Sequence, residues 1–433
     1  MVSTPKAHRG PRRAADRQRE PTAVVIGGSI AGLFTGNMLR RQGWHVEIFE
    51  QAEGPLGIRG AGIAGHAELC DVLSACGIEE PRPPAIDVAG RHAYDRQGQL
   101  IQFYAHPQYM TYWRNMYQLL RSRFPDANYH TGVSLEALEQ RGARTVLRLS
   151  NGRELSPDLV VGADGLRSTV RSALAPSICP QYAGYFAFRG LVPEAELSDR
   201  FRRSVFDRYV FIFPRDGQFC GLPLCGPENE MEPGRRLYTY LWYKRAAGEV
   251  RTDLLTDING ITHAASIPPP LIRSEHFDRL TTEAAETLPA PFGEAVMRAS
   301  QHIFQPIFDM ESERIAFGNV ALVGDAAFVA RPHVGIGVLK AGQDALALSR
   351  ALRAEPDVEA ALAAYQGVRL SVGRNAVRLA RYLGRFIELG HDGPSADPEL
   401  QLSPELIIAA SGRPIEQVEP LLGAMRKAII GWH

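Results

Sequence analysis

The sequence has few of the features that mark secreted, membrane-spanning or nucleic-acid-binding proteins. Its five cysteines form no Cys-x-x-Cys pair and leave an odd count, which predicts reduced thiols in a cytoplasmic protein and argues against a disulfide framework or a metal site. No apolar run reaches the roughly eighteen residues of a transmembrane helix. Residues 1–20 are basic, lack the apolar segment of a signal peptide and are predicted to be a disordered tail. Lys plus Arg and Asp plus Glu are balanced at 48 each, so no net charge points to nucleic acid or an anionic membrane.

Two glycine-rich stretches lie near the N-terminus, and only one has the context of a nucleotide-binding turn. Residues 59–65, RGAGIAG, match the pattern G-x-G-x-x-G letter for letter, but no strand-like run precedes them. Residues 24–33, VVIGGSIAGL, carry Ser29 at the middle glycine position, yet they join an apolar run to a helical pattern over 33–41. A pyrophosphate rests on a helix N-terminus that follows a strand, because unpaired N–H groups point there. The imperfect match is therefore the predicted nucleotide site.

The segment after this helical pattern supports the same prediction. Residues 44–49 read as a second strand, and the strand ends at Glu50. An acidic residue about twenty positions beyond the glycine motif suits the ribose hydroxyls of an adenosine. The alternative is an ordinary βαβ unit with a glycine-rich turn.

Two further apolar runs end in an acidic turn. Residues 159–161 lead into Gly-Ala-Asp-Gly with Asp164, and residues 321–323 lead into Gly-Asp with Asp325. An aspartate after a strand is commonly a helix cap or turn former. Three such strand ends in one chain are harder to dismiss, because ligands collect outside the carboxyl ends of the strands in an open α/β sheet.

These motifs resemble the three signatures of the class A FAD-dependent aromatic hydroxylases, the group with the p-hydroxybenzoate hydroxylase fold. The resemblance runs from residue 22 to about residue 385, and the stretches RGAGI, TYWRNMY, QYAGYFAFRG and GDAAFVARPHVGIG are similar to the 2,6-dihydroxypyridine 3-hydroxylase-like branch. It implies an α/β fold, with a Rossmann-like FAD-binding domain, an inserted β-sheet substrate domain and C-terminal helices. The implied segments are 21–75, 105–178 and 316–385 for the FAD domain, 76–104 and 179–315 for the β-rich substrate domain, and 386–433 for a C-terminal helical segment.

The resemblance also implies a site for non-covalent FAD. The Gly27–Gly32 turn would hold the pyrophosphate, Glu50 the adenosine ribose and Asp325 a ribityl hydroxyl. The GAGI stretch would run beside the isoalloxazine ring, and Asp164 would position the cofactor. The implied cofactor residues are Gly27, Gly28, Ser29, Ile30, Ala31, Gly32, Glu50, Arg59, Gly62, Asp164, Asp325, Pro332, Gly335 and Gly337.

The activity implied by the resemblance is a monooxygenase reaction. NAD(P)H, with NADH favoured, would bind transiently, and O2 would give a flavin C4a-hydroperoxide that hydroxylates an electron-rich, hydroxylated ring. Phe328 and Ile336 stand where many relatives have His and Gln, which favours a hydroxypyridine over a benzenoid substrate; Trp113 stands where many carry an FAD-contacting Arg. The alternatives are a hydroxylase of a benzenoid phenol or hydroxybenzoate and a non-hydroxylating flavin oxidoreductase. A homodimer is a further expectation.

Three residues are candidates for the acceptor of the substrate's hydroxyl proton. His333 follows Pro332 directly, and His66 ends the loop that begins with GAGI. An imidazole with an ordinary pKa of about 6.5 suits this task near neutrality, although each histidine could instead be a hydrogen-bonded structural residue. Tyr240, in the aromatic segment 237–243, is the third candidate.

Overall fold

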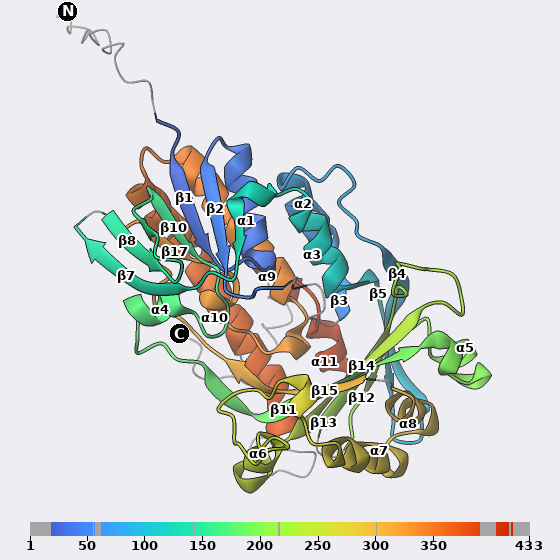
Figure 1. The fold of residues 1–433 in the computed structure, drawn as a ribbon. Helices are drawn as coiled ribbons and strands as arrows, with labels where there is room; N and C mark the ends of the chain where they lie inside the picture. The colour runs from blue at the N-terminus through green and yellow to red at the C-terminus, as the bar shows by residue number, and fades with distance from the viewer. Residues whose placement is uncertain are drawn as a thin grey trace, which may run out of the picture.

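In the computed structural model of the 433-residue chain, the described residues form two large β-sheets and one small antiparallel sheet, with helices packed around them (Figure 1). The structure describes residues 19–54, 56, 62–142, 144–214, 217–299, 301–389, 404–414 and 417–418. Residues 1–18 of the predicted tail and most of the predicted segment 386–433 therefore lie outside the described residues.

The first sheet is the nucleotide-binding type that the sequence predicts. Its strand order is β16-β17-β10-β1-β2-β6, and all neighbours are parallel except the edge strand β16. The strands are β1 (Thr22–Ile26), β2 (His45–Glu50), β6 (Tyr129–Thr131), β10 (Leu159–Gly162), β16 (Ala316–Phe317) and β17 (Val320–Leu322). The short apolar runs around residues 24, 160 and 321 become adjacent strands because each is buried on both faces, as parallel strands require.

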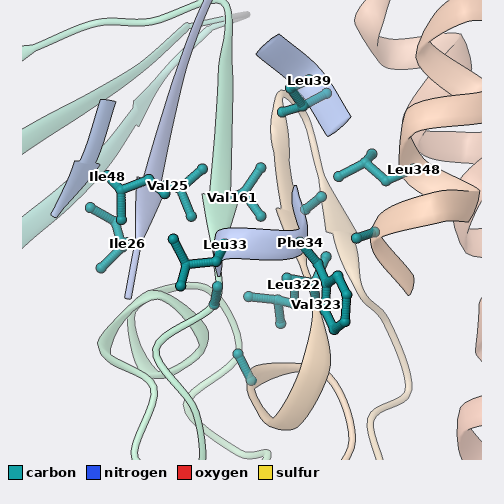
Figure 2. Packing of buried hydrophobic residues seen from close by; sticks show 14 of the residues in the cluster. Val25, Ile26, Leu33, Phe34, Leu39, Ile48, Val161, Leu322, Val323 and Leu348 are labelled. Carbon is teal, nitrogen blue, oxygen red and sulfur yellow. The ribbon is translucent and has the colours of Figure 1, made fainter. Parts of the chain in front are cut away.

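Helices cover this sheet and complete its core. Helix α1 (Ile30–Arg41) packs against α9 (Gly337–Ala354), and α9 packs against the long α10 (Val358–Leu389). Figure 2 shows the core between the strands and α1, where Leu33 and Phe34 lie among Val25, Val161 and Leu322. A small antiparallel sheet of β7 (Leu135–Arg141), β8 (Arg144–Leu149) and β9 (Glu154–Leu155) flanks the first sheet.

The second sheet has eight strands in the order β15-β11-β14-β13-β12-β4-β5-β3. The strands are β3 (Gly62–Gly65), β4 (Ala85–Tyr94), β5 (Leu100–Tyr112), β11 (Gln181–Pro193), β12 (Tyr209–Ile212), β13 (Gly217–Leu224), β14 (Leu237–Arg245) and β15 (Gln301–Asp309). The aromatic runs at 208–213 and 237–243 overlap β12 and β14 of this sheet.

The two faces of this larger sheet contact different parts of the molecule. One face, which we call the inner face, packs on α10, α11 (Pro404–Ala410) and the loop that precedes α9; it includes Leu222, Leu241 and Tyr243. The other face carries Phe186, Tyr240 and Trp242 and is covered by α5 (Asp199–Ser204), α7 (Glu275–Thr287) and α8 (Ala290–Met297). The remaining helices are α2 (Ala67–Ala75), α3 (Trp113–Arg121), α4 (Thr169–Leu174) and α6 (Gly248–Leu254).

The fold class predicted from the sequence is confirmed, but its domain borders pass through continuous β structure. Strand β5 runs unbroken across the proposed border at residue 105, and β3, assigned to the FAD segment, pairs with β5 in the larger sheet. The division of the chain into domains therefore stays a proposal. Among the described residues, no helix is both long and apolar enough to cross a membrane.

Candidate active site

The turn between β1 and α1 is the centre of the predicted nucleotide site. Gly27 has a φ of +103°, which only glycine adopts readily, and its N–H donates to the Phe49 carbonyl at 2.8 Å. A Cβ atom built on Gly32 would lie 1.9 Å from the Gly27 carbonyl oxygen. The turn can therefore close this tightly only with glycine at both positions, and α1 begins directly against the end of β1.

The first turn of α1 leaves its backbone donors without a side-chain cap. Ser29 is the N-cap residue, but its side chain forms no capping hydrogen bond, and no acidic residue lies in the first turn. The N–H groups of Ile30, Ala31 and Gly32 have no partner within the helix and are available to an anion. Helix α9 is likewise uncapped at Ile336 and has no acidic residue in its first turn.

These two helix starts lie close together. A Cβ atom on Gly324, in the turn after β17, would lie 2.8 Å from the Cβ of Ala31 on α1 and 3.6 Å from that of Ala341 on α9. Two uncapped helix N-termini at the carboxyl ends of parallel strands suit a ligand with two separated regions of negative charge, such as the pyrophosphate and the ring of FAD. The residues present therefore fit the cofactor that the sequence predicts.

Glu50 holds the glycine-rich turn from the end of β2. Its buried carboxylate accepts the N–H of Gly28 at 2.9 Å through Oε2 and the N–H of Ala52 at 2.9 Å through Oε1. The Tyr129 hydroxyl on β6 donates to the Gly28 carbonyl at 2.7 Å. The backbone around Gly28 is thus fixed on both its donor and its acceptor side.

A cavity of about 230 Å³ opens beside this turn. Its lining joins the β1 turn, the end of β2, the start of β7 and the turn after β10. The lining residues include Gly27, Ser29, Phe49, Glu50, Trp113, Val133, Leu135, Ala163, Asp164 and Thr169. Trp113 also stacks on Tyr117 with ring centroids 5.3 Å apart, so an aromatic surface stands where many relatives have an arginine.

Asp164 caps the next helix. Its carboxylate accepts hydrogen bonds from the Ser168 hydroxyl at 2.5 Å and from the N–H groups of Thr169 at 2.7 Å and Val170 at 3.1 Å, at the start of α4. Burial raises the pKa of this carboxyl, and the three hydrogen bonds oppose that rise. The positioning role expected for Asp164 stays a prediction, and these bonds give it a physical basis.

Asp325 follows β17 with its carboxylate free. Its side chain is exposed and forms no hydrogen bond or ion pair with the rest of the described chain. The turn beneath it is held through Gly324, whose N–H donates to Asp344 at 3.0 Å and whose carbonyl accepts from Lys340 at 2.7 Å. Asp325 therefore stands ready to accept a ligand hydroxyl from a rigid turn.

Sequence reasoning missed Arg171, which ties two of the motifs together. This buried guanidinium donates to Leu166 O at 2.6 Å, in the turn after Asp164, and to Ala326 O at 3.2 Å, in the turn after β17. Its only sequence signal is its place in the run DGLRSTVR, seven residues after Asp164. The second turn lies far away in sequence, so this bridging role follows from the fold alone.

The loop before α9 forms a single turn of 3-10 helix, Pro332–Val334, followed by Gly335 in the left-handed region at φ +71°. Helix α9 then begins at Gly337. Gly62 lies on β3, where a Cβ atom would approach Leu222 of the inner face to 2.7 Å. The described part of the GAGI stretch thus belongs to an edge strand of the larger sheet and contacts β13 through Leu222, whereas Arg59 lies outside the described residues.

The side chain of His333, in this loop, is buried in the core. Its Nε2 donates to the Ala380 carbonyl at 2.9 Å and its Nδ1 accepts from the Tyr185 hydroxyl at 3.3 Å. Burial lowers its pKa to about 3, so the ring is neutral. With both nitrogens paired, this arrangement favours a structural histidine, and the proposed proton transfer would require the Tyr185 bond to open.

Tyr240 lies on the face of the larger sheet turned away from the proposed site, which argues against its predicted role in proton transfer. Its hydroxyl pairs with His302 Nδ1 at 2.7 Å, and its ring stacks on Phe219 in the cluster under α7 and α8. Side chains alternate along β14, so Leu241 and Tyr243 reach the inner face and Tyr240 cannot.

His66 lies directly before α2 and is 6% exposed. Its Nδ1 is 3.1 Å from the Gln108 amide nitrogen, and its Nε2 has no hydrogen-bond partner of normal geometry among the described residues. Burial, reinforced by the charges of Arg91 and His106, lowers its pKa to about 4. The ring of His66 interacts with the Gly335 carbonyl, but its Nε2 forms no hydrogen bond of normal geometry with a described residue, whereas both ring nitrogens of His333 are paired.

Comparison with known proteins shows which proteins this chain is similar to. The FAD binding domain-like family matches residues 182–309, the stretch from β11 to β15. In sequence and fold the chain is similar to class A flavin monooxygenases, as its motifs predicted, and these similarities support FAD as the cofactor.

Particular relatives narrow the similarity. The 2,6-dihydroxypyridine 3-monooxygenase of Paenarthrobacter nicotinovorans is 29% identical over 384 residues, which cover 87% of this chain and 94% of the relative. The 3-amino-4-hydroxybenzoate 2-monooxygenase of Streptomyces cremeus is 28% identical over 407 residues, covering 87% and 90%. The solved structure of 2,6-dihydroxypyridine-3-hydroxylase from Arthrobacter nicotinovorans superposes with a TM-score of 0.80 at 28% identity, covering 88% of this chain and 96% of that one.

Proposed function

We propose that this protein binds FAD without a covalent bond and uses NAD(P)H, with NADH favoured, and O2 to hydroxylate an electron-rich, hydroxylated aromatic ring, a hydroxypyridine in the first place. The observation that carries the proposal is the meeting of two uncapped helix N-termini, buried Glu50 and exposed Asp325 beside the inner face of the larger sheet. The similarity to a dihydroxypyridine monooxygenase supports the substrate class, while the aminohydroxybenzoate relative keeps a benzenoid ring as the alternative.

The chain's own contribution to cofactor binding is largely backbone. The α1 N-terminus supplies N–H donors for the pyrophosphate, and the α9 N-terminus supplies donors for the ring edge where negative charge gathers on reduction. Bound FAD supplies hydride acceptance from NAD(P)H and activation of O2, which side chains cannot provide. One oxygen atom then enters the substrate ring and the other leaves as water.

The inner face of the larger sheet supplies the dry surface for the substrate ring. Leu222, Leu241 and Tyr243 are buried there together with Val334 and Ile336 from the loop before α9. Such a face excludes water from the reacting atoms, and this limits unproductive loss of the activated oxygen.

Arg189 brings a positive charge to the same face. It pairs with Leu241 across β11 and β14, so the two side chains point to the same side of the sheet, and its buried Nε has no hydrogen-bond partner in the described part of the chain. Burial lowers the pKa of this guanidinium, although the hydroxyls of Tyr243 and Tyr112 favour its charged form. We assign it the stabilisation of a deprotonated ring hydroxyl, the form of the substrate that is most reactive toward an electrophilic oxygen.

The test is a comparison of substrates on the purified, FAD-loaded protein. Hydroxypyridines and hydroxybenzoates are each added with NADH or NADPH, and NAD(P)H oxidation, hydrogen peroxide and 18O transfer from 18O2 into product are measured. We expect hydroxypyridines to stimulate NADH oxidation with 18O in the product. Stimulated oxidation that yields only peroxide with every ring would overturn hydroxylation in favour of a flavin oxidoreductase, and preference for a hydroxybenzoate would overturn the substrate class. A cytoplasmic location and a homodimer are part of the same proposal.

A further inference from the structure

A buried chain of polar side chains leads from the C-terminal segment to His66. Arg91 on β4 is fully buried, and its guanidinium donates to the Ile408 carbonyl at 2.7 Å, to the Gly412 carbonyl at 2.9 Å and to Gln108 Oε1 at 2.7 Å. Ile408 lies on α11 and Gly412 in the turn that follows it. Two backbone carbonyls thus fix the guanidinium in position, and Gln108 is the side chain that it contacts.

The turn at Gly412 is itself fixed to the loop before α9. The Gly412 N–H donates to the Val334 carbonyl at 2.6 Å. A Cβ atom on Gly335 would lie 3.0 Å from the Gly412 Cα, so the two backbones touch. Arg91 is therefore anchored to a turn that packs directly on the proposed flavin-ring loop.

Arg91 determines which way the amide of Gln108 points. A guanidinium only donates hydrogen bonds, so the group facing it must be the amide oxygen. The amide nitrogen of Gln108 then donates to the Gly412 carbonyl at 3.2 Å and faces His66 Nδ1 at 3.1 Å. The reverse orientation would set two donors against each other at Arg91 and two acceptors against each other at Gly412.

The orientation of Gln108 determines in turn where His66 carries its proton. Because the amide nitrogen donates, Nδ1 of His66 must accept, and a neutral imidazole then has its hydrogen on Nε2. The ring stays neutral near pH 7, since burial together with Arg91 and His106 lowers its pKa to about 4. The Gly335 carbonyl lies near enough to favour protonation of the ring, yet Nε2 makes no hydrogen bond of normal geometry with any residue that the structure describes.

We propose that Arg91 and Gln108 hold His66 as its Nε2–H tautomer, so that the imidazole offers a hydrogen-bond donor to an oxygen acceptor of the substrate ring, either a ring carbonyl or a deprotonated hydroxyl. His66 is then a donor that recognises the ring oxygen, in place of the proton acceptor predicted from the sequence. Arg91 and Gln108 are positioning residues that act through it. The identity of the ligand rests on the proposed function, whereas the tautomer does not.

The tautomer can be measured directly on the full-length protein. Long-range 1H–15N NMR of protein labelled at histidine distinguishes Nε2–H from Nδ1–H rings, and a His66→Gln variant assigns the signal. We expect Nε2–H in the parent protein. In Gln108→Glu the carboxylate only accepts, so it keeps the Arg91 bond and requires a proton on Nδ1; the tautomer should invert. Gln102→Glu, the same change on the same strand, should leave His66 unaltered.

The ligand is tested with FAD and with 2,6-dihydroxypyridine as the probe, under anaerobic conditions without NAD(P)H. We expect the Nε2–H resonance to shift when the probe is added to FAD-loaded protein, and the KM for this probe to rise at least tenfold in Gln108→Glu with FAD content unchanged. A shift caused by FAD alone would overturn the assignment to the substrate. An Nδ1–H ring in the parent protein would overturn the whole inference, even if Gln108→Glu failed to fold. Because the tautomer is read without turnover, it stands or falls independently of the hydroxylase activity.

Discussion

Replacing Glu50 with alanine should destabilise the protein before any cofactor binds. The carboxylate accepts two backbone N–H groups at 2.9 Å each, from Gly28 and Ala52, and is 7% exposed. A hydrogen bond to a charged group contributes about 1.5–3 kcal/mol, and part of this is recovered where water can reach the freed N–H. We therefore expect the free energy of unfolding of the FAD-free protein to fall by about 2–4 kcal/mol.

The same change should also weaken FAD binding, because the freed Gly28 amide no longer holds the turn at the pyrophosphate. A loss of about 1–3 kcal/mol corresponds to a rise in Kd of roughly 5- to 150-fold. Turnover at saturating FAD should stay close to normal, since the ribose end lies away from the reacting ring. Glu50→Gln, which keeps one acceptor oxygen, should fall between the parent and Glu50→Ala.

Urea unfolding of the FAD-free protein and FAD titration followed by flavin fluorescence measure the two effects separately. Glu53→Ala, at an exposed glutamate three residues further along, is the matched control and should change neither. An FAD-free Glu50→Ala protein as stable as the parent would refute the reasoning, because Glu50 would then act on the ligand alone.

Substitutions at Gly32, His333 and Tyr240 test other contacts of the structure. Gly32→Ala places a Cβ atom 1.9 Å from the Gly27 carbonyl oxygen and should therefore push α1 away from the turn. We expect a loss of about 1–3 kcal/mol in the free energy of unfolding and a protein that no longer retains FAD on gel filtration. Gly367→Ala, where no atom of the described residues lies within 4 Å of the added Cβ, is the control and should change neither. Burial lowers the pKa of His333 from 6.5 to about 3, so as pH falls through this range the unfolded chain takes up the proton first and stability declines. Between pH 4 and 6, His333→Asn should make the free energy of unfolding fall less steeply with decreasing pH, by about 1.4 kcal/mol per pH unit. Urea unfolding at several pH values measures this slope, and a slope equal to that of the parent protein would show that the ring is not buried in its neutral form. Tyr240→Phe should lower the free energy of unfolding by about 1 kcal/mol, because the hydrogen bond to His302 is lost, and should leave kcat unchanged. A hundredfold fall in kcat would instead show that Tyr240 takes part in the reaction.

The sequence predicts the first sheet well because its signals are local. Apolar runs of three residues, a glycine where α1 meets β1, and an acid at a strand end each reflect the chemistry of a few neighbouring residues. The predicted strand 24–26 and helix 33–41 lie within β1 and α1, and the predicted strand 159–161 lies within β10. The residues predicted to bind the cofactor, Gly27, Glu50 and Asp325, consequently lie at the carboxyl ends of parallel strands of one sheet.

The larger sheet shows where local signals end. From Tyr238 to Tyr243 every residue of β14 is buried, because helices cover one face and the inner face packs on α10 and α11. The hydrophobic pattern of this strand therefore does not show which tyrosine side chains lie on the inner face. The face that each tyrosine takes depends on the pairing of β14 with β11 and β13, which are remote in sequence. A strand that is apolar on both faces therefore does not show on which face Tyr240 lies.

His66 shows a subtler limit, because the sequence shows its place after the GAGI stretch but not which nitrogen of its ring carries the proton. An imidazole accepts or donates according to what binds its other nitrogen, and for His66 that partner is Gln108, 42 residues away. Gln108 is oriented in turn by Arg91, which is itself held by carbonyls more than 300 residues further along the chain. A segment to which the sequence assigns no function, the turn after α11, thereby sets whether the site presents a lone pair or a hydrogen. Proton chemistry in this protein depends on tertiary contacts that no motif near the histidine records.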